Sequence, residues 1–253
     1  MTSRKFSNCL ITICGILFVV LLTGHASSRA DKKKGDEPPF EWAENHADPG
    51  TSLVLTEKNR RRGQRGTVVN YEIQATGFLP DEDLSLWMRF FFNEYDEIPA
   101  TIDEQGRVQL TLPGWPKNIF TKFWIGDYLL GQAVDVALFS KTTNKRAHAK
   151  VFPFTLQAQG NGACSASAEI ASESGYVFLI AFSGFDPGEE IQVTSRYKRE
   201  TLSSTHKASG RGEYAYPVAF GPPDRGKATA TAASKNCSVS LKYKVGRDAR
   251  KVQ

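Results

Sequence analysis

The sequence is poor in the residue types that build metal and catalytic centres. Only four histidines and four cysteines occur among its 253 residues. The three histidines beyond residue 30, His46, His148 and His206, each lack a second histidine or cysteine at metal-ligand spacing. The sequence also lacks a Gly-x-Ser-x-Gly elbow, a His-Glu-x-x-His helix and a phosphate-binding glycine loop. These absences predict a non-enzymatic protein that holds no metal and no cofactor.

Neighbouring carboxylates do occur, but their positions do not suit acid–base catalysis. Asp81 to Asp83 and the pair Glu189 and Glu190 lie in expected turns, where water solvates them. A glycosidase needs two carboxyl groups on facing elements, one of them kept protonated. Clustered carboxylates also suit Ca²⁺, but no spaced loop of the EF-hand type supports a calcium site. An enzyme whose catalytic residues are dispersed between strands stays open as an alternative.

The apolar run near the N-terminus is too short for a typical membrane-spanning helix. It extends from Cys9 to Leu22, fourteen residues, whereas a spanning helix needs about 20. Arg4 and Lys5 precede it and small residues follow it, which is the order of a secretory signal peptide. We therefore expect residues 1–30 to be a cleaved signal peptide and the mature chain to have no stable membrane span. That chain would be secreted, periplasmic or on the cell surface.

Removal of this segment changes the cysteine count. Cys9 and Cys14 would leave with it, so the mature chain keeps Cys164 and Cys237 alone. Two thiols in an oxidising compartment are expected to pair. The chain-entropy model gives about 4 kcal/mol of stabilisation for a closed loop of this length. We predict an intramolecular disulfide between Cys164 and Cys237.

The mature chain also lacks an excess of charge of either sign. Residues 1–30 hold three of the 32 Lys and Arg residues and none of the 27 Asp and Glu residues. The mature chain therefore has 29 basic and 27 acidic residues, a net charge of about +2. Such a balance does not favour a nucleic-acid partner. We expect the partner to be another protein or a component of the cell envelope.

Helical periodicity is nearly absent from the rest of the chain. Residues 31–50 combine charge runs with Pro38 and Pro39 and show no apolar period, which predicts a disordered linker. From Thr51 onward, short runs of β-forming residues alternate with turn residues, which predicts an all-β sandwich architecture. The clearest expected strands are Thr67–Ala75, Leu84–Phe92, Val108–Leu112, Ala133–Phe139, Val151–Leu156, Tyr176–Phe182, Glu190–Tyr197, Glu213–Val218, Ala228–Ala233 and Ser238–Val245.

The sequence contains an internal repeat. Residues 76–90 match residues 183–197 at a constant offset of 107, and residues 106–113 match residues 210–217 at an offset of 104. Two blocks in the same order at nearly the same offset indicate a duplicated domain. We place domain 1 at residues 51–158, domain 2 at residues 159–247 and a basic tail at residues 248–253. Gly160 to Gly162 would supply a flexible break at the join.

The better-defined copy of the repeated block reads Gly-Phe-Asp-Pro-Gly-Glu-Glu-Ile, from Gly184 to Ile191. Its glycine permits a sharp change of direction, and Pro187-Gly188 suits a type II turn. This stretch resembles the strand–turn–strand signature of immunoglobulin-like modules in exported bacterial proteins; domain 1 has a looser version. The resemblance implies two tandem immunoglobulin-like β-sandwiches that serve as binding units, spacers or scaffolds. A weaker likeness, in the order of elements, is to the neocarzinostatin-type sandwich, which holds an aromatic ligand in a cleft.

All four tryptophans precede residue 125, and one segment there is crowded with aromatic residues. Residues 113–131 have no counterpart of equal length in domain 2, so they form an insertion. Their rings either cover an open end of the sandwich as core or form a flat recognition surface. The candidate ligand-binding residues are Trp115, Phe120, Trp124 and Tyr128. The sequence thus predicts an exported binding or structural protein, with carbohydrate or small-ligand binding through this segment as the alternative.

Overall fold

The structure is a computed structural model that describes residues 38–40, 42, 47–62, 67–91, 93–111, 123–126 and 129–249. These residues fall within one compact unit, Asp36–Gln253. The expected signal peptide, residues 1–30, and the end of the expected basic tail, residues 250–253, lie outside the described residues. In the described ranges, no helix is long and apolar enough to cross a membrane.

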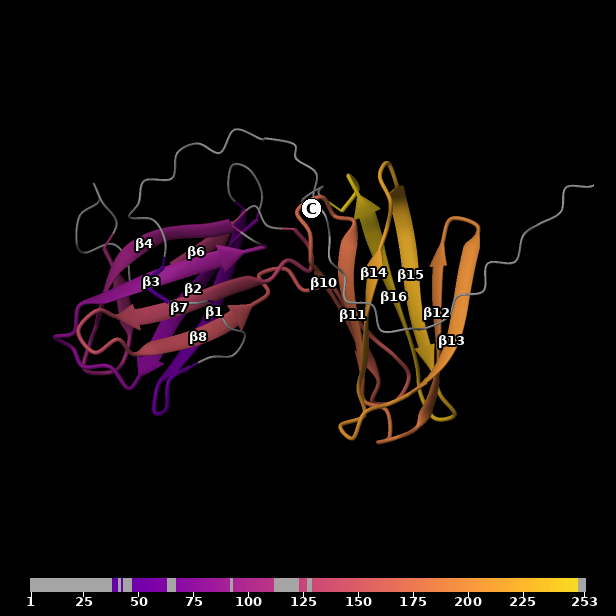
Figure 1. Cartoon of the computed structure of the whole chain (residues 1–253), viewed down its shortest axis with the longest axis horizontal. Coiled ribbons are helices and arrows are strands. Elements are labelled where there is room, and N and C mark those ends of the chain that lie inside the picture. The colour runs from indigo at the N-terminus through magenta and orange to yellow at the C-terminus, as the bar shows by residue number, and fades with distance from the viewer. Residues whose placement is uncertain are drawn as a thin grey trace, which may run out of the picture. The chain divides into compact units, whose positions relative to one another are not determined.

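The described part of the chain consists of β-strands and connections, with no helix (Figure 1). The strands of the first half are β1 (Ser52–Arg62), β2 (Thr67–Thr76), β3 (Leu84–Phe90), β4 (Asn93–Ile102), β5 (Val108–Leu110), β6 (Phe123–Gly126), β7 (Val134–Ser140) and β8 (Arg146–Val151). Those of the second half are β9 (Gln157–Gln159), β10 (Ser165–Ile170), β11 (Val177–Ser183), β12 (Glu190–Tyr197), β13 (Glu200–Lys207), β14 (Tyr214–Ala219), β15 (Arg225–Ala233) and β16 (Ser238–Gly246).

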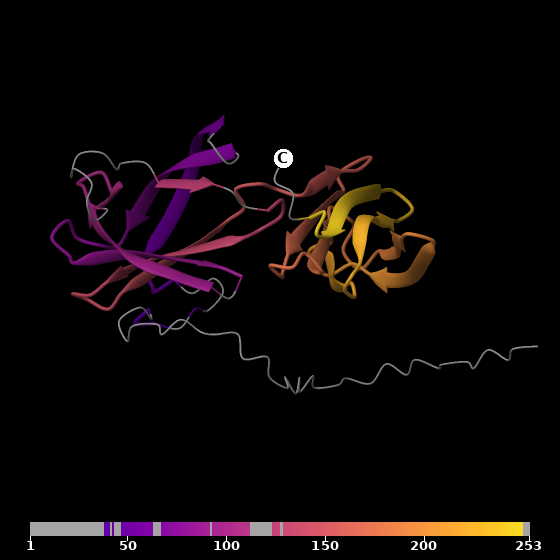
Figure 2. The same cartoon turned by 90° about the horizontal axis from the view of Figure 1, so that it is seen from above.

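Each half of the chain forms one β-sandwich of antiparallel strands. In the first, the sheet β1-β2-β6 packs against the sheet β5-β4-β3-β7-β8; in the second, β14-β11-β10-β9 packs against β13-β12-β15-β16. Figure 2 shows the strands of the second sandwich nearly end-on. This architecture confirms the predicted fold class, two tandem immunoglobulin-like β-sandwiches.

A large apolar core fills each sandwich. Alternate side chains of a strand point to opposite faces of its sheet, so β10 buries Ala166, Ala168 and Ile170 and leaves the residues between them partly exposed. The buried residues of the first core lie between Leu53 and Ala147, and those of the second between Leu156 and Val245.

The repeated sequence block forms the same local structure in both sandwiches. Gly77 and Gly184 have φ angles of 86° and 84°. A Cβ atom at either position would collide with backbone atoms of the strand entry beside it, which explains why both copies need glycine. In the second copy, Gly188 also has a positive φ of 75°, as a type II turn requires at this position.

The aromatic and acidic residues of the block are also equivalent. Phe78 and Phe185 are both buried. The carboxylate of Glu82 accepts a hydrogen bond from the backbone N–H of Leu79, and the carboxylate of Glu189 accepts one from Asp186. These acids therefore cap their own turns. The sequence predicted solvated turn carboxylates, but Glu82 is buried, with 6% of its surface accessible, because its carboxylate accepts hydrogen bonds from the turn and from Thr143.

The segment between the sandwiches differs in detail from the sequence expectation. The expected strand Val151–Leu156 does not form, because β8 ends at Val151 and Pro153 cannot donate a backbone hydrogen bond. Strand β9 already pairs with β10 before residue 160. Gly160 and Asn161 are hydrogen-bonded within the second sandwich, to Cys164 and Ser238. The domain boundary itself remains a prediction.

An N-terminal strap, by which we mean the described residues among 38–50, contacts the outer face of the sheet β5-β4-β3-β7-β8. The ring of Phe40 lies 5.6 Å from that of Phe139 and 6.2 Å from that of Trp87. Asp48 exchanges two hydrogen bonds with the backbone of Arg146. This cover explains why every residue of β7 is buried. The sequence predicted a disordered linker at residues 31–50, but the residues of this range that the structure describes make these contacts.

Candidate binding cleft

The predicted disulfide is present. Cys164 and Cys237 are bonded, with their Cα atoms 6.0 Å apart. Cys164 immediately precedes β10 and Cys237 immediately precedes β16, so the bond links the two sheets of the second sandwich. Both cysteines are buried.

The predicted aromatic site cannot be placed in the same way. Trp115, Phe120 and Tyr128 lie outside the described residues. The backbone of Trp124 belongs to β6, opposite Asn70 of β2, and its side chain is outside the description. Recognition through residues 113–131 therefore stays a prediction.

The described residues form a different aromatic site, which we call the edge cleft. It lies on the second sandwich between the hairpin β12–β13 and the end of β14, and has a volume of about 260 Å³. That volume is slightly below the usual range for small-molecule sites. The residues that line it are Ser195, Arg196, Tyr197, Lys198, Glu200, Leu202, Val218, Ala219, Phe220, Gly221, Asp224 and Tyr243.

Aromatic rings connect the edge cleft to the core. The ring of Phe220 lies 4.9 Å from Tyr197 and 6.2 Å from Tyr243, and Tyr243 in turn lies 4.9 Å from the buried Phe178. Burial raises the pKa of the Tyr243 hydroxyl, so this group stays neutral in ordinary buffers. The cleft therefore presents uncharged rings that are held in place by their contacts with the aromatic residues of the core.

A row of further rings continues along the edge of the sandwich. Tyr214 and Tyr216 occupy alternate positions of β14 and stack at 5.9 Å, and His206 of β13 stacks on Tyr214 at 4.3 Å. Strand pleating places alternate residues on one face, so these rings face the open side between β13 and β14. Tyr216 also shares a hydrogen bond of 2.8 Å with Ser195. These rings supply stacking surfaces with hydroxyl groups beside them.

An ion pair holds one end of the edge cleft. The ammonium of Lys198, in the turn of the β12–β13 hairpin, donates a hydrogen bond of 2.6 Å to Asp224. This contact raises the pKa of Lys198 and lowers the pKa of Asp224. Both groups are solvated, so the pair orients the turn more than it stabilises the fold.

Leu202 is the most exposed large apolar side chain in the described part of the chain, at 74% of its full accessible surface. It lies on β13 and lines the edge cleft. An exposed leucine beside a row of aromatic rings is the arrangement expected of a contact surface. In chemical terms, the cleft can hold an apolar or aromatic group of a ligand. The polar side chains of the cleft can form hydrogen bonds with ligand atoms beside that group.

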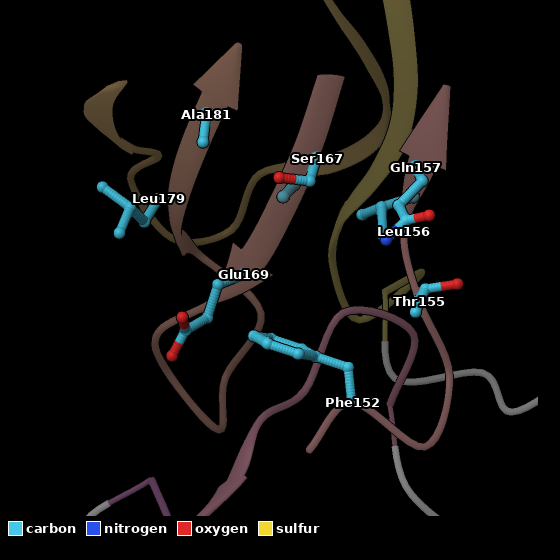
Figure 3. Close-up of a pocket in the computed structure, with 9 residues that line it drawn as sticks. Phe152, Thr155, Leu156, Gln157, Ser167, Glu169, Leu179 and Ala181 are labelled. Carbon is cyan, nitrogen blue, oxygen red and sulfur yellow. The ribbon is translucent and has the colours of Figure 1, made fainter. Parts of the chain in front are cut away.

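A second, smaller hollow lies on the outer face of strands β9 to β11 and has a volume of about 150 Å³. Figure 3 shows the Phe152 ring extending toward Glu169 at one end of the hollow, with Ser167 and Ala181 at the other. Glu169 lies 3.6 Å from Lys150. Several residues that line this hollow, among them Ser167 and Ala181, have short side chains that offer little contact area to a ligand. The edge cleft is therefore the stronger candidate. In the described ranges, no three His, Cys, Asp or Glu side chains gather as metal ligands would.

No protein-family model and no curated protein matches the chain. Solved structures similar to it include a tetra-tandem repeat in the extending region of a large adhesion protein, with 14% identity and a TM-score of 0.25. The similarity covers 79% of this chain and 50% of that one. The chicken interferon gamma receptor alpha chain gives 7% identity, coverage of 78% and 98%, and a TM-score of 0.22. For Salmonella alpha-2-macroglobulin the identity is 12%, the coverage 82% and 17%, and the TM-score 0.20. TM-scores this low do not inform the function of this chain.

Proposed function

We propose that this chain is an exported, non-enzymatic binding protein whose second sandwich contacts its partner through the edge cleft. The observation that carries the proposal is the exposed Leu202, which lines a cleft whose other apolar groups include Tyr197, Val218 and Phe220. Tyr197, Val218 and Phe220 are themselves partly exposed beside Leu202, and a contiguous exposed apolar patch of this kind often marks a contact site. The Cys164–Cys237 disulfide supports an oxidising location.

Site-specific photo-crosslinking tests this proposal. A benzophenone amino acid replaces Leu202 in the mature chain, and the protein is exposed to envelope and secreted material from the source cells. The matched control carries the same group at Leu79, which is 61% exposed and far from the cleft in sequence. We expect a discrete adduct from position 202 and none from position 79. Equal labelling from both positions, or none from either, would contradict the proposal.

A charge substitution gives an independent measurement. Leu202→Glu puts a carboxylate into the cleft mouth, while Leu79→Glu adds the same charge elsewhere. Because both leucines are exposed, each variant should keep the melting temperature of the parent within about 2 °C. We expect adduct formation to fall only when the charge is at position 202. Adducts that consist of glycan instead of protein would show that the ligand of the edge cleft is a carbohydrate; the separate prediction of carbohydrate binding through residues 113–131 would stay untested.

A further inference from the structure

The edge strands of the described sheets differ in how well they are protected against pairing with another strand. An exposed edge presents free backbone N–H and C=O groups, which proteins usually guard with short strands, charges, prolines or bulges. Strands β5, β6 and β9 have only three or four residues. Strand β1 carries a run of arginines and a register shift between Glu57 and Asn59. Strands β8 and β16 carry basic residues within the strand.

Strand β13 has none of these protections. It is eight residues long, pairs with β12 without a register shift, and has charges only at its ends, Glu200 and Lys207. Its other edge has no strand partner in the described part of the chain. Figure 1 shows it at the border of its sheet, next to β12.

Hydrogen bonds at the end of β13 show which backbone groups are free. The N–H of Ala208 donates to Glu189, the residue opposite it on the β12 side. Because successive residues of an antiparallel strand direct their backbone groups to alternate sides, the even-numbered residues of β13 pair with β12. The N–H groups of Thr201, Ser203 and Thr205 therefore point to the open edge.

The facing edge strand, β14, is guarded at its centre. The N–H of Phe220 donates to Tyr176, so the even-numbered residues of β14 pair with β11 and the odd-numbered ones face outward. Pro217 is one of the latter and has no N–H to offer. The two edges that border the open side are thus unequal, and only β13 can accept a full ladder of hydrogen bonds.

The first sandwich shows how the equivalent edge is used. By the internal repeat, β3 and β4 correspond to β12 and β13. The outer edge of β4 is paired with β5, with Ala100 opposite Leu110 and Ile102 opposite Val108. Val108 and Leu110 are buried, and Gln109 between them is exposed. An edge of this type in this chain thus accepts an antiparallel strand with alternating apolar residues.

The second sandwich has the hydrogen bond that starts this pairing, but its next strand pairs with a different sheet. In the first, the N–H of Asp103 donates to Arg107 at the start of β5; in the second, the N–H of Ser209 donates to Glu213. Beyond that point Tyr214 pairs with Phe182 of β11 instead of continuing along β13. The edge that β5 occupies in the first sandwich is therefore left open in the second.

We propose that β13 is a strand-addition site: an extended segment of a partner protein pairs antiparallel with its outer edge and inserts alternate apolar side chains into the edge cleft. This inference rests on the proposed function and names its ligand class. The even-numbered residues of β13, including Leu202, have their side chains on the side of the cleft, so an added strand would direct its own alternate side chains there. Of the residues that a second copy of β13 would direct there, Glu200, Leu202, Ser204 and His206, only Leu202 is apolar, whereas the much shorter β5 directs two apolar side chains, Val108 and Leu110, to one face.

The test uses a labelled synthetic peptide with the sequence of residues 105–112, Gln-Gly-Arg-Val-Gln-Leu-Thr-Leu, which contains the strand that occupies the equivalent edge. Fluorescence anisotropy measures its binding to the full mature chain, residues 31–253. We expect saturable binding with a Kd below about 1 mM, since a short peptide must lose its chain entropy on pairing.

Two pairs of matched variants, one in the protein and one in the peptide, distinguish backbone pairing from binding through side chains alone. Ser203→Pro removes an outward N–H and should weaken peptide binding at least tenfold, whereas Ser203→Ala keeps that N–H and should bind as the parent does. If Ser203→Pro does not fold, Thr201→Pro makes the same test.

In the peptide, the backbone N–H of Gln109 should face the edge of β13. In the first sandwich the N–H of Thr111 donates to Pro99 of β4, so the odd-numbered residues of β5 direct their backbone groups to the neighbouring strand. N-methylation at the position of Gln109 should abolish binding, while N-methylation at the position of Leu110 should not.

Each remaining outcome has a defined meaning. Absence of peptide binding up to about 1 mM, or binding insensitive to both backbone changes, overturns strand addition. If photo-crosslinking at position 202 succeeds all the same, the proposed function stands and only this inference falls. If the mature chain dimerises in sedimentation and Ser203→Pro abolishes the dimer, the occupant is a second copy, and the proposal of a partner protein is wrong.

Discussion

At the scale of single residues, a polar cluster lies under the N-terminal strap. Asp135, on the interior strand β7, accepts hydrogen bonds of 3.1 and 3.3 Å from Arg89 on β3. The ring nitrogen Nε2 of His148, on β8, lies 3.3 Å from the other carboxylate oxygen. Trp42 of the strap contacts both side chains: the guanidinium carbon of Arg89 lies 5.0 Å from the centre of its ring, and the centre of the His148 ring lies 6.2 Å from it.

This cluster predicts a pH dependence of stability. Burial acts to raise the pKa of Asp135, but the neighbouring His148 ring and the hydrogen bonds from Arg89 outweigh it and leave that pKa below its ordinary value. A depressed folded-state pKa means that the contribution is present above the unfolded value of about 4 and is lost as pH falls through the folded value. Asp135→Asn should cost about 1–3 kcal/mol at pH 7. Urea unfolding from pH 7 to pH 2 should show a shallower acid decline in this variant, and an unchanged decline would contradict the assignment.

The disulfide predicts a second residue-scale effect. Cys164 and Cys237 close a loop of 73 residues and join the two sheets of the second sandwich. Replacing both by alanine should lower the free energy of unfolding by about 2–4 kcal/mol, because the unfolded chain regains the freedom that the bond removes. Thermal unfolding of the second sandwich measures the loss, and the parent protein kept in reductant should show a similar one. A variant as stable as the parent would show that the core alone fixes the two sheets.

The sequence predicted some of these residues and not others, for a physical reason. Cys164, Cys237 and the repeated Gly77 and Gly184 carry a signal in their own chemistry. The Arg89–Asp135 pair could not be predicted, because it depends on which residues of β3 and β7 lie opposite each other. The edge cleft was missed for the same reason, although alternation of Tyr214, Tyr216 and Val218 in one expected strand was a usable signal.

At the scale of elements, most of the expected strands formed. Nine of them correspond to β2, β3, β5, β7, β11, β12, β14, β15 and β16. Strand β10 was not among the expectations, although its alternate residues are buried. The edge strands β1 and β13 were not among the clearest expectations, because their outward side chains are arginine, serine and threonine. Solvated edges do not need the alternation of a half-buried strand, so periodicity cannot find them. The property that hides β13 in the sequence is also the one that leaves it open to a partner.

The N-terminal strap leads to a prediction of its own. Phe40 contacts Trp87, Phe139 and Trp42, and its removal would expose the outer face of β3 and β7. Phe40→Ala should lower the free energy of unfolding by about 1–3 kcal/mol, less than for a fully buried phenylalanine because this side chain is only half-buried. It should also increase binding of an apolar dye. Leu79→Ala serves as the control for an exposed apolar residue, and identical behaviour of the two variants would show that the strap does not protect this sheet.

At the scale of the whole molecule, the division into two cores follows from how each sandwich completes its own sheets. Strands β9 to β16 pair only among themselves, in the described part of the chain, and the buried residues of their core all lie between Leu156 and Val245. The sequence predicted this duplication but expected the join at Gly160 to Gly162. Those glycines are held against Cys164 and Cys237 in the second sandwich, and the stretch from Phe152 to Leu156 has no strand.

This organisation predicts that residues 155–253 fold without the rest of the chain. About 100 residues can bury enough apolar surface for a stable core, and the disulfide lies wholly within the fragment. Expressed in an oxidising compartment, the fragment should give a β-type circular dichroism spectrum and one cooperative unfolding transition. Because the edge cleft and β13 also lie within this fragment, it should bind the 105–112 peptide with an affinity within about threefold of that of residues 31–253. If the fragment folds but does not bind the peptide, part of the binding surface lies in the first sandwich. If the fragment stays unfolded, the second core depends on the first for its stability.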